Sequence, residues 1–181
     1  MKIIKTALEG AVIIEYEEKA DVRGMKTVSF SEKDMADAGI AFKFAEERIY
    51  RPEKAGTLYG IHFQNNPKPQ AKIMYCLNGR GLDYAVDLRK SSPNYLKWVC
   101  VELSGENKRQ FFIPKGFGHA FLSLEENTVV AMRIDEPFDK ALSRQIAWND
   151  PETAIDFPVK APILAPHDIN APLLSDSDIN L

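Results

Sequence analysis

Cysteine and histidine are scarce in this 181-residue sequence, and it contains no long apolar run. Its two cysteines, Cys76 and Cys100, lie inside apolar strand-like segments, which predicts buried thiols without a disulfide. No apolar stretch reaches the roughly 18 to 20 residues of a membrane span, and the first residues lack the pattern of a secretory signal. We therefore expect a cytoplasmic protein with no membrane partner.

Clustered positive charge is absent as well. The 23 lysines and arginines are outnumbered by 26 acidic residues, the net charge is −3, and no stretch is strongly basic. A face that binds nucleic acid usually gathers lysine and arginine, so we expect no nucleic acid partner. A few well-placed arginines could still hold a phosphate group.

Short strands separated by turns account for most of the chain. Alternation of apolar and polar residues predicts strands over residues 40–44 and 82–87. The other strand candidates are residues 12–16, 57–63, 72–77, 98–103, 110–113 and 128–134. Asn78-Gly79 predicts a β-hairpin, because both residues tolerate positive φ in a tight turn.

Helical signals are few. Ser31 predicts the N-cap of one short helix, and five prolines from Pro151 onward predict a C-terminal segment that wraps the core. The sequence shows no internal repeat and no domain boundary between the predicted strands. The predicted fold class is all-β: a single jelly-roll β-barrel domain spanning residues 1–181, with a few short helices.

The three histidines, His62, His119 and His167, are the first candidates for chemistry. Residues 114–119 (PKGFGH) reproduce the Pro-x-Gly-x-x-His pattern of the second motif of cupin jelly rolls, whose histidine points into the barrel. The first cupin metal motif needs two histidines one residue apart and a later glutamate, but Gly60 precedes His62 and no glutamate follows nearby. Two histidines are too few ligands for a firmly held metal, so we predict none and expect proton transfer instead.

Ordered motifs run through the chain from about Arg23 onward. They are GTLYGIHFQ (56–64), PQAK (69–72), DYAVDLR (83–89), SP (92–93), LSGEN (103–107), IPKGFGHAF (113–121), WNDP (148–151) and DINAPLL (168–174). Together they resemble the dTDP-4-dehydrorhamnose 3,5-epimerase family. The resemblance implies a cupin-like homodimer without a cofactor, which epimerises a nucleotide-linked 4-keto-6-deoxy sugar at C3, C5 or both on the way to cell-wall or capsule polysaccharide.

The chemistry of that reaction suits the residues of this sequence that match the family's motifs. A ketone at C4 acidifies the hydrogens on C3 and C5, because the carbanion delocalises onto the ketone oxygen as an enolate. By resemblance His62 is the catalytic base, Asp168 orients its imidazole, and Lys72 offers positive charge to the enolate. His119 is expected to line the same pocket, and Asp83 to position Lys72.

The sequence departs from the family at the proton donor. The two tyrosines that the family carries after the His119 motif fall on Met132 and Phe138, and neither side chain can donate a proton. The acid that reprotonates the opposite face of the sugar must then be another hydroxyl, such as Tyr59 or Tyr50, or a water molecule.

The expected phosphate-binding residues are also altered. Tyr59 replaces a family arginine on the strand that carries the base, and either Arg51 or Arg23 could supply the missing charge. By resemblance Gln64 belongs with these residues to the substrate-binding set. A strand at residues 12–16 could pair with a partner's sheet in the homodimer.

Several functions remain open at this point. The chain could be a 3,5-epimerase with a replaced acid, an epimerase of a single carbon or of a different nucleotide keto sugar, or a non-catalytic sugar-nucleotide-binding barrel. The retention of His62, Lys72 and Asp168 favours the two enzymes, whereas the missing tyrosines favour the binding protein. A metal-dependent cupin enzyme is a fourth, weaker alternative.

Overall fold

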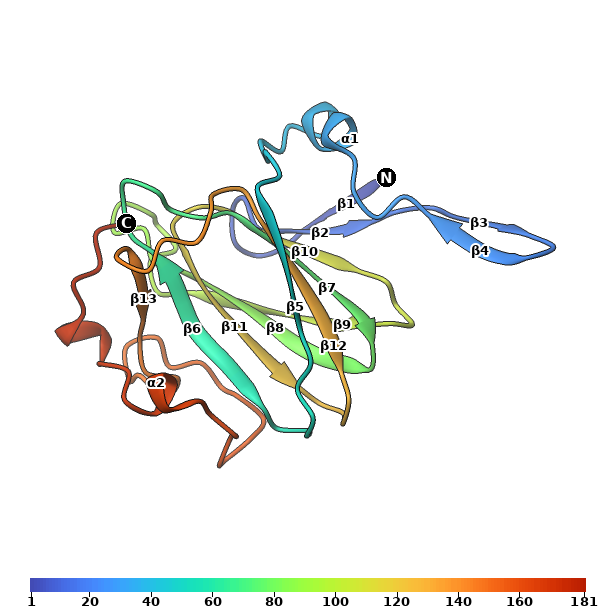
Figure 1. Cartoon of the computed structure of the whole chain (residues 1–181). Coiled ribbons are helices and arrows are strands. Elements are labelled where there is room, and N and C mark those ends of the chain that lie inside the picture. The colour runs from blue at the N-terminus through green and yellow to red at the C-terminus, as the bar shows by residue number, and fades with distance from the viewer.

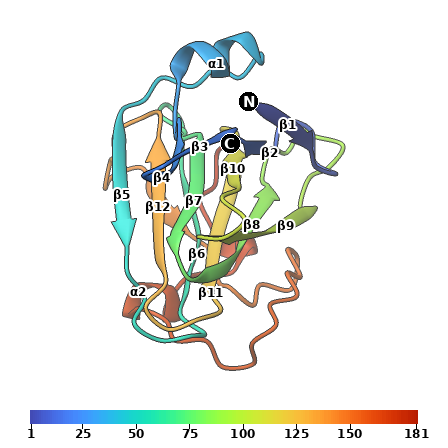
Figure 2. The same cartoon turned by 90° about the vertical axis from the view of Figure 1, so that its right-hand side faces the viewer.

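Two antiparallel β-sheets face each other in the computed structural model, which describes residues 1–181 (Figures 1 and 2). The six-stranded sheet consists, in spatial order, of β1 (Lys2–Lys5), β2 (Val12–Glu15), β10 (Gln110–Ile113), β7 (Lys72–Asn78), β12 (Val129–Ile134) and β5 (Glu46–Tyr50). The five-stranded sheet consists of β13 (Ser143–Gln145), β6 (Leu58–Gln64), β11 (Phe117–Ser123), β8 (Arg80–Asp87) and β9 (Trp98–Ser104). A separate hairpin of β3 (Glu18–Asp21) and β4 (Gly24–Thr27) projects from the body (Figure 1).

The helical elements are short and peripheral: α1 (Glu32–Asp37), α2 (Pro166–Ile169) and the 3-10 turn η1 (Leu174–Asp176). The predicted N-cap is confirmed, because the Ser31 hydroxyl accepts a hydrogen bond from the backbone N–H of Asp34 at 3.2 Å. None of these helices has the length and apolar character needed to cross a membrane. With two antiparallel sheets that face each other and only these three short helical elements, the predicted all-β jelly roll with a few short helices is confirmed.

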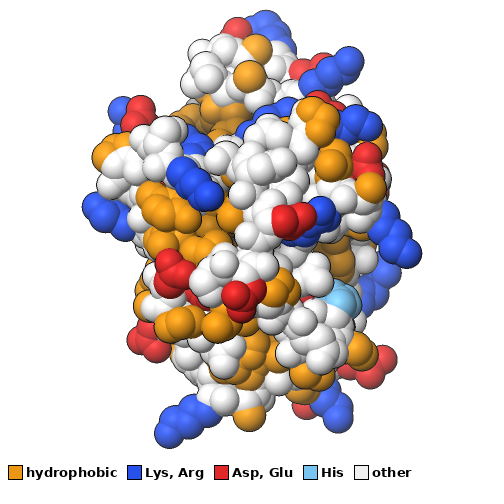
Figure 3. Space-filling model, turned by 90° about the vertical axis from the view of Figure 1, so that its left-hand side faces the viewer, with side chains coloured by type: hydrophobic (Ala, Val, Ile, Leu, Met, Phe, Trp, Pro, Cys, Tyr) orange, Lys and Arg blue, Asp and Glu red, His pale blue; other side chains and the backbone are white.

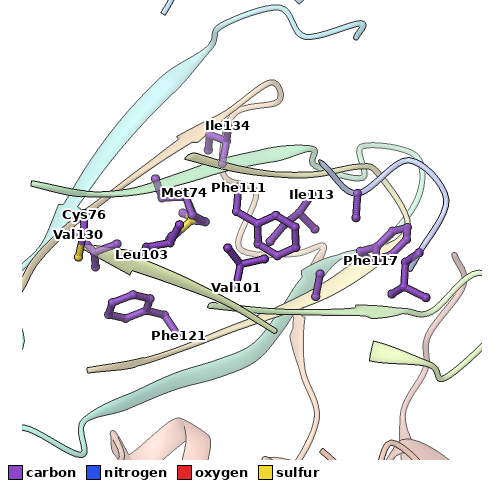
Figure 4. Packing of buried hydrophobic residues seen from close by; sticks show 14 residues of the cluster. Met74, Cys76, Val101, Leu103, Phe111, Ile113, Phe117, Phe121, Val130 and Ile134 are labelled. Atoms are coloured by element: carbon purple, nitrogen blue, oxygen red, sulfur yellow. The ribbon is translucent and has the colours of Figure 1, made fainter. Parts of the chain in front are cut away.

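The main core lies between the sheets because alternate side chains of each strand point inward. Met74 and Phe111 of the six-stranded sheet meet Val101, Leu103 and Phe121 of the five-stranded sheet there, all at most 5% exposed (Figure 4). Two smaller cores lie on the outer faces. The C-terminal segment covers the five-stranded sheet, and helix α1 with the loop that follows it covers part of the other.

The strand predicted at residues 40–44 is wrong, because this segment is a loop. Its alternation arises from side-chain packing alone: Phe42 is buried against Phe30 and Phe112, and the half-exposed Phe44 also packs against Phe30, while Lys43 faces solvent. A single side of the segment contacts the core, but no neighbouring strand offers a hydrogen-bonding ladder. The hydrophobic period of two therefore reports burial here and not strand pairing.

Three further predictions from the sequence are corrected by the structure, two by the sheet topology and one by burial. Asn78-Gly79 does not form a hairpin, because β7 and β8 belong to different sheets and Gly79, at φ 70°, turns the chain from one sheet to the other. Strand β2 pairs with β1 and β10, so it is not free to pair with another chain. Both cysteines are free thiols, as predicted, but only Cys76 is buried and Cys100 is exposed.

A β-bulge in strand β6 brings two polar side chains to the inner face. His62 pairs with His119 of β11 and Tyr59 pairs with Phe121, so three steps along β6 match two along β11. The extra residue lets both Tyr59 and His62 point inward, which regular alternation would forbid. Gly60 forms this bulge at φ 117°, where a Cβ atom would lie 2.5 Å from the carbonyl oxygen of His119.

Replacing Gly60 should therefore damage both the fold and the site. Gly60→Ala is expected to cost about 3 kcal/mol or more in the free energy of unfolding, because backbone strain adds to a clash with backbone atoms. Gly24→Ala is the matched control, since Gly24 has φ 121° with nothing within 4 Å of its added Cβ, and should cost only about 1 to 2 kcal/mol. Urea unfolding measures both values, and equal losses would contradict the packing argument.

Candidate active site

A cavity of about 690 Å³ lies between the two sheets. Strands β5, β7 and β12 form one wall, strands β6, β11 and β13 form the other, and His167 of α2 contributes from the C-terminal segment. Its ionisable and hydroxyl-bearing lining residues are Arg48, Tyr50, Tyr59, His62, Lys72, His119, Lys140, Ser143 and His167. On the face where β13 and α2 lie, lysine and arginine side chains are scattered rather than gathered into a cluster (Figure 3).

His62 and Asp168 form a close pair at the cavity. The Nε2 atom of His62 lies 2.6 Å from Oδ1 of Asp168, although the two residues are 106 positions apart in the sequence. The Asp168 side chain is 2% exposed, while that of His62 is 31% exposed and reaches the cavity. A carboxylate that accepts the hydrogen of Nε2 fixes the imidazole tautomer, which leaves Nδ1 of His62 free to accept a proton.

Lys72 places a buried amino group beside the same pair. Its Nζ donates a hydrogen bond to the backbone carbonyl oxygen of His62 at 3.1 Å, and the residue is 4% exposed. Burial lowers the pKa of Lys72 to about 8, although the Asp83 carboxylate raises it, and Arg48 lowers it further. The amine is therefore largely charged at neutral pH but loses its proton more easily than a surface lysine.

His119 and Asp83 form a second imidazole–carboxylate pair deeper in the site. Nε2 of His119 lies 2.6 Å from Oδ1 of Asp83, and Oδ2 of Asp83 has no hydrogen-bond partner. Burial raises the pKa of Asp83 well above its usual value, opposed by the charge of Lys72. Burial, Lys72 and His62 all lower the pKa of His119, which is therefore neutral at neutral pH. His119 and Lys72 line the same cavity, as expected, whereas Asp83 makes its hydrogen bond with His119 and none with Lys72.

The position expected for a proton-donating tyrosine is apolar. Met132 and Phe138 both line the cavity, and Arg48 stacks over the Phe138 ring at 4.6 Å. Two tyrosines lie nearby, with the ring centroids of Tyr50 and Tyr59 5.3 Å apart. Burial raises the pKa of Tyr50, and the Arg48 charge opposes that shift. Tyr50 extends from the sheet opposite the one that carries His62.

Two arginines predicted to bind substrate lie outside the cavity lining. Arg23 occupies the turn of the projecting hairpin, where it is paired with Asp21 at 2.7 Å and its side chain is 80% exposed. Arg51 follows the end of β5 and faces solvent. Arg48, which the sequence did not single out, is the arginine that reaches the cavity, because its register with Met132 of β12 turns its side chain inward.

Gln64 has a structural partnership instead of a free amide. Its Nε2 donates to the backbone carbonyl oxygens of Lys68 at 2.6 Å and Pro137 at 3.3 Å, and its Oε1 accepts from the N–H of Asp139 at 2.9 Å. Gln64 is absent from the cavity lining. The Gln64 amide therefore holds two loops beside the site through bonds within the chain.

The arrangement of His62, Asp168 and Lys72 indicates which class of reaction the site can catalyse. An imidazole base oriented by a buried carboxylate lies beside a buried cation, and both border one cavity lined by polar and apolar residues. That arrangement suits an acid–base enzyme that moves protons on carbon next to a carbonyl group, because the cation stabilises the enolate that forms.

Comparison with known proteins specifies the family. The family model for dTDP-4-dehydrorhamnose 3,5-epimerase matches residues 5–176. The chain is 38% identical to the dTDP-4-dehydrorhamnose 3,5-epimerase of Shigella flexneri over 98% of each protein. The chain belongs to the dTDP-4-dehydrorhamnose 3,5-epimerase family and is a carbohydrate epimerase.

Solved structures agree with this assignment. The crystal structure of the Bacillus anthracis dTDP-4-dehydrorhamnose 3,5-epimerase with TDP and PPi bound has a TM-score of 0.92 at 38% identity, covering 96% of this chain and 99% of that one. A dTDP-6-deoxy-D-glucose-3,5-epimerase from Legionella pneumophila, in complex with dTDP-4-keto-L-rhamnose, also has a TM-score of 0.92 at 38% identity, with coverage of 98% and 94%.

Proposed function

We propose that this enzyme inverts C3, C5 or both of a nucleotide-linked 4-keto-6-deoxy sugar through an enolate. The observation that carries the proposal is the 2.6 Å contact between His62 and Asp168 at a cavity that Lys72 also lines. Nδ1 of His62 removes the proton from the carbon beside the ketone, and the electron pair of the C–H bond moves onto the C4 oxygen. Asp168 stabilises the resulting imidazolium, and the Lys72 ammonium stabilises the enolate oxygen.

Inversion requires that the carbon receive its new proton from the face opposite His62. Tyr50, Tyr59 or a water molecule supplies it, since Met132 and Phe138 cannot donate a proton. Both tyrosines line the cavity, and burial raises the pKa of each phenol, so both keep a proton to donate at neutral pH. No organic cofactor takes part, because the ketone of the substrate itself stabilises the carbanion.

The nucleotide diphosphate requires positive charge that Tyr59 does not provide. Arg48 lines the cavity and is the first candidate within the chain. Arg23 could contribute only to the cavity of another subunit, because it sits on the projecting hairpin. All residues of β3 and β4 are exposed, and an isolated two-stranded hairpin is marginally stable in water, so a partner surface would support it. These features support a homodimer.

The cytoplasm is the compartment that we propose for this reaction. The two thiols, Cys76 and Cys100, are both free, which suits a reducing compartment.

Deuterium uptake from heavy water into dTDP-4-keto-6-deoxyglucose tests the reaction, with the labelled position identified by NMR. We expect incorporation at C3 and C5, accompanied by inversion. Absence of incorporation into this and other nucleotide 4-keto sugars would contradict catalysis and leave a sugar-nucleotide-binding protein.

A single-centre epimerase is the second candidate, and the apolar surfaces of Met132 and Phe138 favour it. A 3,5-epimerase must reprotonate two different carbons, C3 and C5. A cavity with fewer proton donors on one wall can reprotonate one of these carbons faster than the other. Label at only one carbon in the heavy-water experiment would select this function.

A further inference from the structure

The proposed proton transfer leaves His167 without a role. This residue directly precedes Asp168 in α2, and its side chain is 60% exposed at the mouth of the cavity. Its ring lies parallel to that of His62 within 29°, with the ring centroids 5.7 Å apart. Two histidines from distant parts of the sequence therefore meet at one buried carboxylate.

The donor atoms of these three residues converge on a small volume. Oδ1 of Asp168 lies 2.6 Å from Nε2 of His62 and 3.5 Å from Nε2 of His167. One ligand atom from each residue can be chosen so that all three lie within 4.8 Å of one another. Donors bound to a tetrahedral zinc ion at about 2.0 to 2.2 Å are separated by about 3.3 Å, so small side-chain movements would complete the geometry.

We propose that His62, His167 and Asp168 bind one divalent transition-metal ion, such as Zn²⁺, and that the bound ion inhibits catalysis. Two imidazoles and one carboxylate favour Zn²⁺, Ni²⁺ or Co²⁺ over Mg²⁺ and Ca²⁺, which prefer oxygen ligands. Three protein ligands leave a fourth position open to water. The exposed His167 side chain can adjust toward the ion, whereas the buried Asp168 carboxylate supplies a fixed negative charge.

Inhibition follows from the tautomer of His62. In the active enzyme the hydrogen sits on Nε2, where Asp168 accepts it, and Nδ1 is the free base. An ion bound at Nε2 displaces that hydrogen, and the neutral ligand then carries its hydrogen on Nδ1. The nitrogen that must accept the substrate proton is thereby blocked, and Asp168 no longer orients the ring through a hydrogen bond. The inhibitory part of this inference rests on the proposed function, whereas metal binding does not.

Cobalt binding tests the site independently of activity. Chelator-treated protein is titrated with Co²⁺, and the visible absorption of the bound ion is followed before competition with Zn²⁺. We expect one ion per chain, and we expect His167→Asn to weaken binding by at least about 10- to 100-fold. Asp176→Asn is the control, because Asp176 is an exposed carboxylate of the same C-terminal segment but outside the cluster, and its loss should leave binding unchanged.

The same variants are then assayed for deuterium exchange, with each rate compared to that variant's own rate without metal. The Zn²⁺ concentration for half-inhibition should rise in His167→Asn by at least about tenfold, in parallel with the loss of affinity. Unaltered Co²⁺ spectra in His167→Asn, or no binding to the wild-type protein, would overturn the site. Full exchange at saturating Zn²⁺ would overturn the inhibition. A wild-type protein without exchange activity contradicts the proposed function, and the cobalt titration still decides the metal site.

Discussion

His62→Asn is expected to lower the rate of deuterium exchange by about 10²- to 10⁴-fold, the usual contribution of a general base. The substituted amide can still hydrogen-bond Asp168, but it cannot accept a proton from carbon. Binding of dTDP, measured by calorimetry, should be nearly unchanged, because His62 acts on the sugar. Near-normal exchange in this variant would exclude His62 as the base.

Asp168→Asn provides the companion test of orientation. The amide occupies the same volume but lacks the charge that stabilises the imidazolium and selects its tautomer, and an equivalent change in a hydrolase triad costs about 10⁴-fold. We expect a loss similar to that of His62→Asn. The double variant should be little worse than either single variant, since the two residues act as a unit. Fully additive losses would indicate that Asp168 has a separate role.

The strands that carry the site could be predicted because their sequences obey local rules. Residues 82–87 alternate cleanly, and the resulting strand places Asp83 on the inner face beside His119. The pairing of His62 with Asp168 could be predicted only by resemblance to the family. It joins a central strand to a C-terminal helix of four residues, and no local pattern specifies that contact.

The inward direction of Arg48, where the sequence analysis proposed Arg51 or Arg23, shows what local patterns cannot supply. Strand β5 has the exposed apolar Ile49 between the inward-facing Arg48 and Tyr50, the reverse of ordinary burial. The inner face is polar here because it borders a cavity. A prediction that places the apolar residue of an alternating strand inside would therefore turn Ile49 inward and Arg48 outward, which is wrong. The register of β5 with β12 determines which residues face inward, and that register depends on the folded sheet. The sequence gives His167 no specific role for a similar reason, because its proximity to His62 arises from tertiary packing.

Loss of activity above pH 8 is the second large effect that we expect. Lys72 has a pKa of about 8, so its positive charge disappears as the pH rises through that value and the enolate loses its stabilising cation. Lys72→Met should lower the exchange rate by about 10²- to 10³-fold, as loss of one electrostatic donor does, and should remove the alkaline decline. Asp83→Asn should move the decline to lower pH, because the Asp83 carboxylate raises the pKa of Lys72. A decline at unchanged pH in Lys72→Met would assign it to another group.

The stability of the protein should respond to the same ionisation with the opposite sign. Lys72 titrates near pH 8 in the folded protein but near 10.5 when unfolded, so between these values the unfolded chain binds more protons. The free energy of unfolding of the wild type, relative to Lys72→Met, should therefore rise by about 3 kcal/mol from pH 8 to pH 10.5. Urea unfolding of both proteins across this range measures the difference. Activity that falls while this difference rises would show that the enzyme keeps a charged lysine in its core at the expense of stability, as catalysis through an enolate requires.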